Sequence, residues 1–242
     1  MVLIPAGEFW QGCNKKADSD CEKDEKPGRT VRLSAFKIDK YEVTASRFAD
    51  FLNREGNPKQ KYFLENDYAT IVKDHKTGKY RPRESFKKKP ANNVSWFGAD
   101  AYCKSFGKEL PTEAQWEKAA RGTDGRKFPW GNRGAHYYKL VYGTRFGLEK
   151  MAEIDAKEEG FSPYGLNHMS GNIVEWTAYW YSTDYYENAT PKDPIGPVIG
   201  TMRILKGGSW YSDEIYVRPS YRHSASPEER DNRYGLRCAL RQ

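Results

Sequence analysis

The sequence of 242 residues has no apolar run that approaches the roughly 18 residues needed to cross a membrane. Its first residues, Met1-Val2-Leu3-Ile4-Pro5, are too few to form a signal peptide. We therefore expect no membrane span in this chain, and we expect that any signal segment is absent from it.

The sequence also lacks a Cys-x-x-Cys motif, which argues against the common zinc and redox sites. It has four cysteines, an even number that favours disulfides, and the spacing of Cys13 and Cys21 in a polar loop suits a bridge. Four reduced thiols, two of them buried as small apolar residues, are the alternative. Disulfides would place the protein in an oxidising compartment, outside the cytoplasm.

Long basic runs are missing as well, although the net charge is +7 and the isoelectric point is near 9.0. Lys87-Lys88-Lys89 is the one short run, and the other basic residues are spread among 33 acidic ones. Nucleic-acid binding needs clustered Lys and Arg. We therefore expect no nucleic-acid partner.

Aromatic residues make up 14% of the chain although the mean hydropathy is only −0.91. A core built on a few large rings, with many loops at the surface, fits this composition. The length suits one large domain over residues 1–242. We expect an α+β domain with much irregular structure.

Local signals predict one strand region and three helices. Apolar residues alternate over 30–41, with a change of face near Ser34, which is typical of a strand. Cap residues then predict helices that follow Thr44, Ser95 and Thr112. Their expected ranges are 45–53, 97–106 and 113–121. Residues 54–92 are polar and rich in lysine, so we expect a long surface excursion there.

The most distinctive stretch is 206–240, which reads KGGSWYSDEIYVRPSYRHSASPEERDNRYGLRCAL. A Gly207-Gly208-Ser209 opening, two spaced arginines and a Gly235-Leu236-Arg237 close resemble the terminal signature of the formylglycine-generating enzyme, or sulfatase-modifying factor, superfamily. The resemblance implies a C-type-lectin-like α+β fold. It also implies a disulfide between Cys103 and Cys238, at positions that the resembled enzymes join.

In those enzymes two cysteines after the Gly-Gly-Ser opening hold copper(I), and these positions here are Ser212 and Val217. Copper(I) chemistry of this kind needs two soft thiolates. We therefore expect no copper, no required cofactor and no enzyme activity. The alternative is an enzyme of altered chemistry, for which Ser212 and His223 are the formal nucleophile and base.

The segment 164–176 resembles the family segment that carries a structural calcium. By this resemblance the ligands are His168, Met169, Gly171, Ile173 and Glu175. His168 replaces the usual oxygen donor, and calcium prefers oxygen. A metal-free turn in which His168 bonds to backbone is therefore the alternative to a calcium site.

Some proteins of the C-type-lectin-like fold are the variable proteins of diversity-generating retroelements. The template of such a retroelement carries Asn codons, and these codons are mutated at adenine. Such codons never yield Lys, Trp, Gln or Met, and the window 211–237 contains none of these four. At the chain's own composition about four would be expected there. Glu214, Glu228 and Glu229 cannot arise from such codons and would be fixed by the template.

We therefore predict a non-catalytic display protein whose variable region, about 207–237, binds a protein or glycan. The predicted ligand-binding residues, expected on one solvent-facing patch, are Tyr211, Ser212, Asp213, Ile215, Tyr216, His223, Ser224, Ser226, Asp231, Arg233 and Tyr234. The predicted scaffold residues are Gly207, Gly208, Trp210, Arg218, Arg222, Gly235 and Arg237. We expect a monomer, secreted or at a bacterial cell surface. An accessory domain of a surface complex is the remaining alternative.

Overall fold

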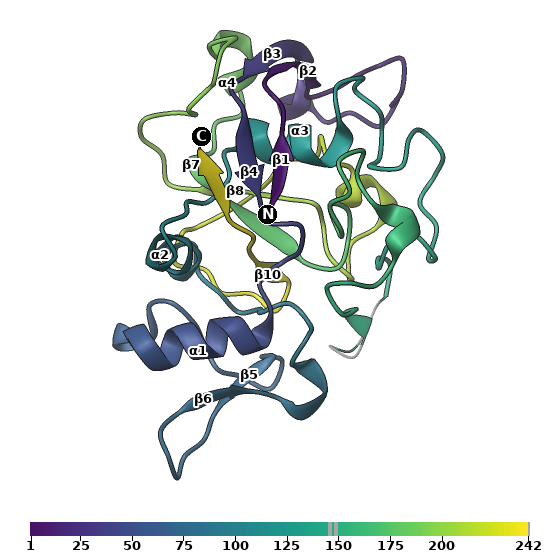
Figure 1. Ribbon diagram of the computed structural model, residues 1–242. Coiled ribbons are helices and arrows are strands. Elements are labelled where there is room, and N and C mark those ends of the chain that lie inside the picture. The colour runs from purple at the N-terminus through teal and green to yellow at the C-terminus, as the bar shows by residue number, and fades with distance from the viewer. Residues whose placement is uncertain (145–146, 148–149, 242) are drawn as a thin grey trace.

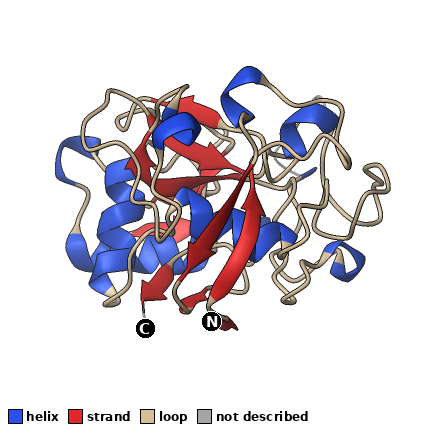
Figure 2. Ribbon diagram, turned by 90° about the horizontal axis from the view of Figure 1, so that it is seen from above, coloured by secondary structure: helices blue, strands red, loops and turns tan. Residues whose placement is uncertain are grey.

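A computed structural model describes residues 1–144, 147 and 150–241 of the chain. The α-helices are α1 (Ala45–Glu55), α2 (Trp96–Ser105), α3 (Glu113–Arg121) and the short α4 (Tyr185–Asn188). Short 3-10 helices are η1 (Lys23–Glu25), η2 (Pro58–Gln60), η3 (Glu84–Phe86), η5 (Glu158–Gly160) and η6 (Glu214–Val217). Loops join these elements over much of the molecule (Figure 2).

The strands form four small sheets. One sheet has the order β1-β4-β11, built from Val2–Ile4, Phe36–Ile38 and Ala239–Arg241. A second has the order β10-β7-β8-β9, built from Tyr234–Gly235, Val174–Trp180, Arg203–Lys206 and His223–Ala225. β2 (Gly7–Gln11) pairs with β3 (Arg29–Leu33), and β5 (Ile71–Lys73) pairs with β6 (Tyr80–Pro82).

Both chain ends lie in the first sheet. β1 and β11 pair antiparallel with opposite edges of β4, so residues near the two termini lie on either side of this strand (Figure 1). The disulfide Cys103–Cys238 joins α2 to the residue just before β11. The last strand is therefore held by hydrogen bonds to β4 and to Glu109, and by a covalent link to a helix.

The predicted helices and caps are confirmed. Thr112 Oγ1 accepts from the Gln115 amide, and the Gln115 side chain accepts from the Thr112 amide, at 3.1 and 2.9 Å. Thr44 and Ser95 also accept the expected amide hydrogens. The predicted strand region is two strands, β3 and β4, and the break at residues 34–35 falls at the predicted change of face.

The prediction of a surface excursion over 54–92 is wrong in part. Phe63, Ala69 and Ile71 are fully buried and belong to the same apolar cluster as Phe48 of α1. The β5–β6 hairpin lies against α1 at one end of the molecule (Figure 1). These apolar residues are widely spaced among charged ones, so they form no periodic pattern that would predict a buried strand or helix.

Both predicted disulfides are confirmed. Cys13 and Cys21 are bonded, as are Cys103 and Cys238, with Cα atoms 5.6 Å apart in each pair. The alternative of four reduced thiols is therefore wrong. Within the described ranges no helix is both long enough and apolar enough to cross a membrane.

Candidate ligand-binding site

A pocket of about 280 Å³, here called the C-terminal pocket, opens beside the end of β8 and η6. It is lined by Val174, Leu205, Gly207, Gly208, Ser209, Tyr211, Ser212, Asp213, Tyr216, Tyr221, His223, Arg233 and Tyr234. Four tyrosines surround a smaller number of charged and hydroxyl groups. Such a lining offers apolar contact area together with hydrogen-bonding groups.

Two glycines make the turn that begins the pocket wall. Gly207 and Gly208 have φ of 98° and 66°, which L side chains rarely adopt. A Cβ on Gly208 would lie 2.6 Å from the main-chain oxygen of Tyr216. The turn therefore needs glycine here both for its dihedral angle and for the close approach of η6.

The loop after this turn is held mainly through its backbone. The Trp210 amide donates to the Asn172 carbonyl at 3.0 Å, and the Trp210 and Ser212 carbonyls accept from the amides of Thr144 and Gly143. The Ser209 amide donates to Ser212 Oγ at 2.9 Å. The side chains of Tyr211 and Asp213 take part in none of these bonds, so the loop path does not depend on them.

Arg218 anchors the far side of the loop in the interior. Its Nη1 donates to Asp18 at 2.7 Å and its Nη2 donates to Glu25 at 2.7 Å, and all three side chains are buried. The opposite charges and hydrogen bonds of these two acids outweigh the effect of burial and raise the pKa of Arg218. The N-terminal loop thus holds the arginine that supports η6.

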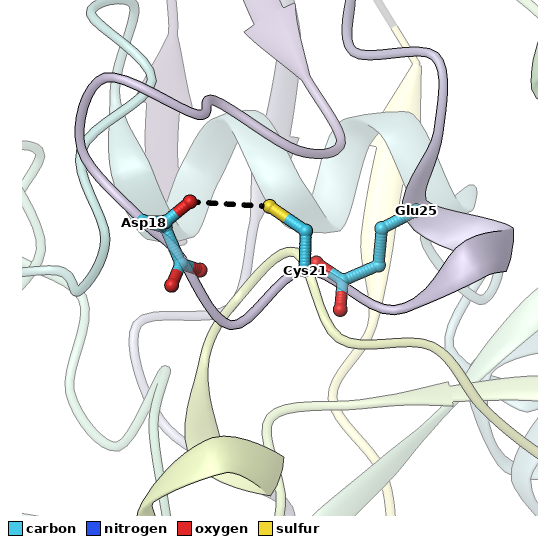
Figure 3. Close-up of side chains that lie close together, drawn as sticks. All are labelled: Asp18, Cys21 and Glu25. Atoms are coloured by element: carbon cyan, nitrogen blue, oxygen red, sulfur yellow. Dashed lines mark hydrogen bonds between the residues drawn. The ribbon is translucent and has the colours of Figure 1, made fainter.

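Asp18, Cys21 and Glu25 lie close enough to resemble a metal-binding cluster (Figure 3). Cys21 is bonded to Cys13, so its sulfur is not available as a thiolate ligand. Asp18 and Glu25 point their carboxylates at Arg218. The cluster is therefore a binding site for a guanidinium of the same chain and does not offer a metal a set of free donors.

A second buried arginine, Arg222, anchors the segment that leads into β9. It donates to both carboxylate oxygens of Glu113 on α3, at 2.7 and 3.2 Å, and Tyr186 donates to the same carboxylate at 3.0 Å. Burial alone would raise the pKa of Glu113, but the charges of Arg222 and Lys206 outweigh it and lower the pKa. The capped helix α3 therefore positions this wall of the pocket.

His223 and Tyr234 form the inner polar contact of the pocket. The His223 Nε2 lies 2.8 Å from the Tyr234 hydroxyl, and the rings are 5.7 Å apart. The pKa of His223 is lowered, mainly by burial and to a smaller extent by the positive charge of Arg233. Arg233 makes two 2.7 Å hydrogen bonds to Asp231. At neutral pH the pocket therefore contains an uncharged imidazole and an arginine whose charge is already balanced.

The structure gathers seven of the eleven predicted ligand-binding residues around the C-terminal pocket. They are Tyr211, Ser212, Asp213, Tyr216, His223, Arg233 and Tyr234. Ile215, Ser224, Ser226 and Asp231 do not line it. The expectation of one shared patch is therefore met by part of the set only.

Tyr234 corrects the expectation that the lining is solvent-facing. Only 3% of it is exposed, because its ring packs edge-on against Trp176 with centroids 5.3 Å apart. Tyr211 and Tyr216, by contrast, are 49% and 41% exposed. Of the predicted scaffold residues, Trp210, Arg218 and Arg222 were expected to be buried and are, and Arg237 is buried as well.

Sequence reasoning missed Tyr221, which also lines the pocket. The alternation of side chains along an extended segment could have identified it. In such a segment the two neighbours of the inward-facing Arg222 point to the opposite side. Tyr221 and His223 flank Arg222 and both reach the pocket. Applying the period of two to this segment would have added Tyr221 to the prediction.

Two of the predicted calcium ligands, His168 and Glu175, already bond to other groups of the protein. His168 Nε2 lies 3.1 Å from the Glu153 carbonyl, and burial lowers the pKa of His168 to about 4. Both Glu175 oxygens accept from Arg237, at 2.6 and 2.7 Å. A calcium ion at Glu175 would have to compete with this guanidinium, so the donor set does not fit calcium in this arrangement. The predicted calcium site at His168, Met169, Gly171, Ile173 and Glu175 stays an untested prediction.

The donors needed for copper are also missing from the corresponding positions. Ser212 is half-buried beside Ser209, and Val217 is fully buried. Ser212 and His223, the alternative catalytic pair, are not hydrogen-bonded to each other. Ser212 bonds to Ser209, and His223 bonds to Tyr234.

Small sheets, few helices and long connecting loops define an α+β protein of the C-type-lectin-like class. Its fold matches that of Treponema denticola variable protein 1 with a TM-score of 0.75 and 25% identity, over 100% of this chain and 95% of that one. The sulfatase-modifying factor enzyme 1-like domain matches residues 1–242. The chain belongs to this family, that of the formylglycine-generating enzymes.

Two relatives show how widely the domain is used. The chain is 36% identical to a formylglycine-generating enzyme of Thermomonospora curvata, over 99% of this chain and 92% of that protein. It is 33% identical to the serine/threonine-protein kinase pkn1 of Chlamydia pneumoniae, over 99% of this chain. The chain spans only 37% of the length of the Chlamydia protein.

Proposed function

We propose that the protein is a display protein that binds a partner protein at the C-terminal pocket without catalysing a reaction on it. The observation that carries this proposal is the convergence of seven predicted variable residues on one pocket. They come from separate turns and strands between residues 211 and 234. Their meeting around one opening is what a diversified binding surface requires.

The chemistry of the pocket supports a protein ligand. Exposed Tyr211 and Tyr216 offer rigid contact area at low entropic cost, and Asp213 and Ser212 add adaptable hydrogen bonds. A hollow of about 280 Å³ lies just below the range for small-molecule sites, which begins at about 300 Å³. It fits one protruding side chain of a partner. A single sugar ring of a glycan is the alternative occupant.

The absence of thiolates at residues 212 and 217 supports a non-catalytic role. All four cysteines of the chain are consumed by disulfides, so no thiolate remains to bind copper(I) or to form a covalent intermediate. The two disulfides also support an extracytoplasmic location, secreted or at a cell surface. The domain would then work as a rigid holder for the pocket.

Sequencing the surrounding DNA and natural copies of the gene tests this proposal. We expect a near-repeat of the 3′ end that differs mainly at adenines, beside a reverse transcriptase gene. We also expect natural variation to concentrate at Tyr211, Ser212, Asp213, Tyr216 and His223. Variation spread evenly along the chain, with no such repeat, would overturn the diversified reading and favour an accessory domain of a surface complex.

A further inference from the structure

We propose that a second hollow, beside the Cys13–Cys21 loop, is a binding site for an acidic oligosaccharide. This hollow, here called the lysine hollow, has a volume of about 690 Å³. Lys15, Lys16, Lys23 and Lys26 all line it. It is larger than the C-terminal pocket and is built from the N-terminal loop and the segment before α4. The proposal does not depend on the function of the C-terminal pocket.

The four lysines are exposed, and none of them forms an ion pair among the residues that the structure describes. In the ranges that the structure describes, no ion pair, side-chain hydrogen bond or cation–π contact uses the ammonium group of any of them. Lys127, in the neighbouring part of the chain, is by contrast paired with Asp18 and Asp20. The four lysines outnumber the two acidic residues of the lining, Asp184 and Glu187, so the hollow keeps a positive potential that an anionic ligand would neutralise.

One aromatic ring, that of Trp10, lines the hollow and is held in place. Trp10 and Pro27 line it, and Trp10 Nε1 donates to the Cys13 carbonyl at 3.0 Å. A Cβ on Gly28 would lie 2.8 Å from Trp10 Nε1, and a Cβ on Gly125 would lie 3.0 Å from Trp10 Cδ1. The indole is therefore wedged between two backbone segments. A fixed aromatic ring below a rim of cations suits a sugar ring that bears anionic groups.

Two acidic side chains decide between a sugar and other polyanions. Asp184 and Glu187 also line the lysine hollow, and both are exposed. Their carboxylates accept hydrogen bonds from sugar hydroxyls. An acidic oligosaccharide has such hydroxyls beside its anionic groups, whereas a poly-glutamate peptide and a DNA backbone do not. The mixture of cations, an aromatic ring and hydroxyl acceptors therefore favours an acidic oligosaccharide.

A further pair of acids separates this site from the C-terminal pocket. Glu22 and Asp24 line a smaller hollow that shares Lys23 with the lysine hollow and Tyr221 with the C-terminal pocket. An anionic chain would be repelled there. The oligosaccharide should therefore occupy the lysine hollow alone and leave the C-terminal pocket open.

Titration calorimetry of the oxidised protein tests the proposal. The probes are a heparin hexasaccharide, which is sulfated, and a galacturonate hexasaccharide, which is carboxylated, with neutral maltohexaose as the control sugar. We expect at least one acidic sugar to bind, with no detectable binding of maltohexaose. Binding to heparin alone assigns sulfate as the anion, and binding to galacturonate assigns carboxylate.

Two charge-matched variants locate the binding. In the first variant Gln replaces Lys15, Lys16, Lys23 and Lys26. The dissociation constant of the acidic sugar should rise at least about tenfold, because the modest contributions of four exposed lysine–anion contacts are lost at once. Replacing Lys59, Lys76, Lys79 and Lys192 with Gln removes the same charge elsewhere and should change binding less than about twofold. Tyr216→Ala should leave sugar binding unchanged, which separates this site from the C-terminal pocket.

Several results would overturn the proposal. Equal losses in the two quadruple variants would mean that only the net charge attracts the sugar. Failure of both acidic sugars to bind, or equally tight binding of maltohexaose, would remove the site. Tighter binding of a poly-glutamate peptide or a single-stranded oligonucleotide would replace the sugar with that class of ligand.

Discussion

Arg218 Nη2 donates a 2.7 Å hydrogen bond to the carboxylate of Glu25, 193 residues earlier in the chain. Both side chains are fully buried. The charge-assisted contact ties the N-terminal disulfide loop to the wall of the C-terminal pocket. The region proposed to vary thus rests on residues far from it in sequence.

Replacing Arg218 with Met should lower the free energy of unfolding by about 3–5 kcal/mol, because Glu25 is left as an unpaired buried charge and Asp18 keeps only its contact with Lys127. Urea unfolding followed by tryptophan fluorescence measures the change. The matched control is Arg233→Met, which breaks a partly exposed pair with Asp231 and should cost less than about 1 kcal/mol. Equal costs for the two variants would contradict the anchoring role.

The two disulfides should contribute unequally to stability. In the chain-entropy view, Cys103–Cys238 spans 135 residues and should contribute about 5 kcal/mol, whereas Cys13–Cys21 spans 8 and should contribute about 2.5 kcal/mol. Replacing each pair separately with alanines and comparing denaturant midpoints tests the order. A larger loss for the short bridge would show that local packing of its loop dominates.

His168 should make stability depend on pH. Burial lowers its pKa from 6.5 to about 4, so the unfolded chain binds a proton below pH 6.5 that the folded protein binds only near pH 4. The free energy of unfolding should therefore fall by roughly 3 kcal/mol between pH 6.5 and 4 from this group.

Gln at residue 168 tests this dependence, because its amide can still donate to the Glu153 carbonyl. His168→Gln should flatten the pH profile of stability in that window. His75→Gln, at an exposed position, should leave the profile unchanged. A profile that is the same in all three proteins would show that other groups cause the acid sensitivity.

Exposed and buried residues of the display region should respond differently to substitution. Tyr211→Ser, Asp213→Ser and Tyr216→Ser should each change stability by no more than about 0.5 kcal/mol, since these side chains are exposed. Trp210→Ala should cost about 3–5 kcal/mol by leaving a cavity. Thermal unfolding compares them. Large losses at all four positions would rule out a surface that tolerates variation.

Copper(I) should not bind, and a sulfatase-derived cysteine peptide should not be converted to formylglycine. Ser212 and Val217 supply no thiolate at the positions that need one. Mass spectrometry of the peptide after incubation with copper(I) and oxygen measures conversion. Turnover above that of a buffer blank would contradict this prediction.

Much of the fold was predictable because its signals are local. Thr112 and Gln115 specify the start of α3 within four residues, and Gly207-Gly208 specifies a turn. The Cys103–Cys238 bridge came from resemblance to a family. These features depend on neighbours in sequence or on a known pattern.

The remaining features depend on distant partners and were not predictable. The pairing of Arg218 with Asp18 and Glu25 spans about 200 residues, and no periodicity connects them. Tyr234 is buried because β10 pairs with β7 in parallel and brings the ring against Trp176. A two-residue strand is too short for alternation to indicate which side chain faces inward.

The backbone-held loop after Gly208 has a practical consequence for protein engineering. Its path is set by main-chain bonds from Trp210 and Ser212 and by the Arg218 anchor, and not by the side chains at residues 211 and 213. Residues 211, 213 and 216 can therefore be randomised together with little loss of folded clones. The chain offers a disulfide-stapled scaffold for selecting new binding proteins from a combinatorial library.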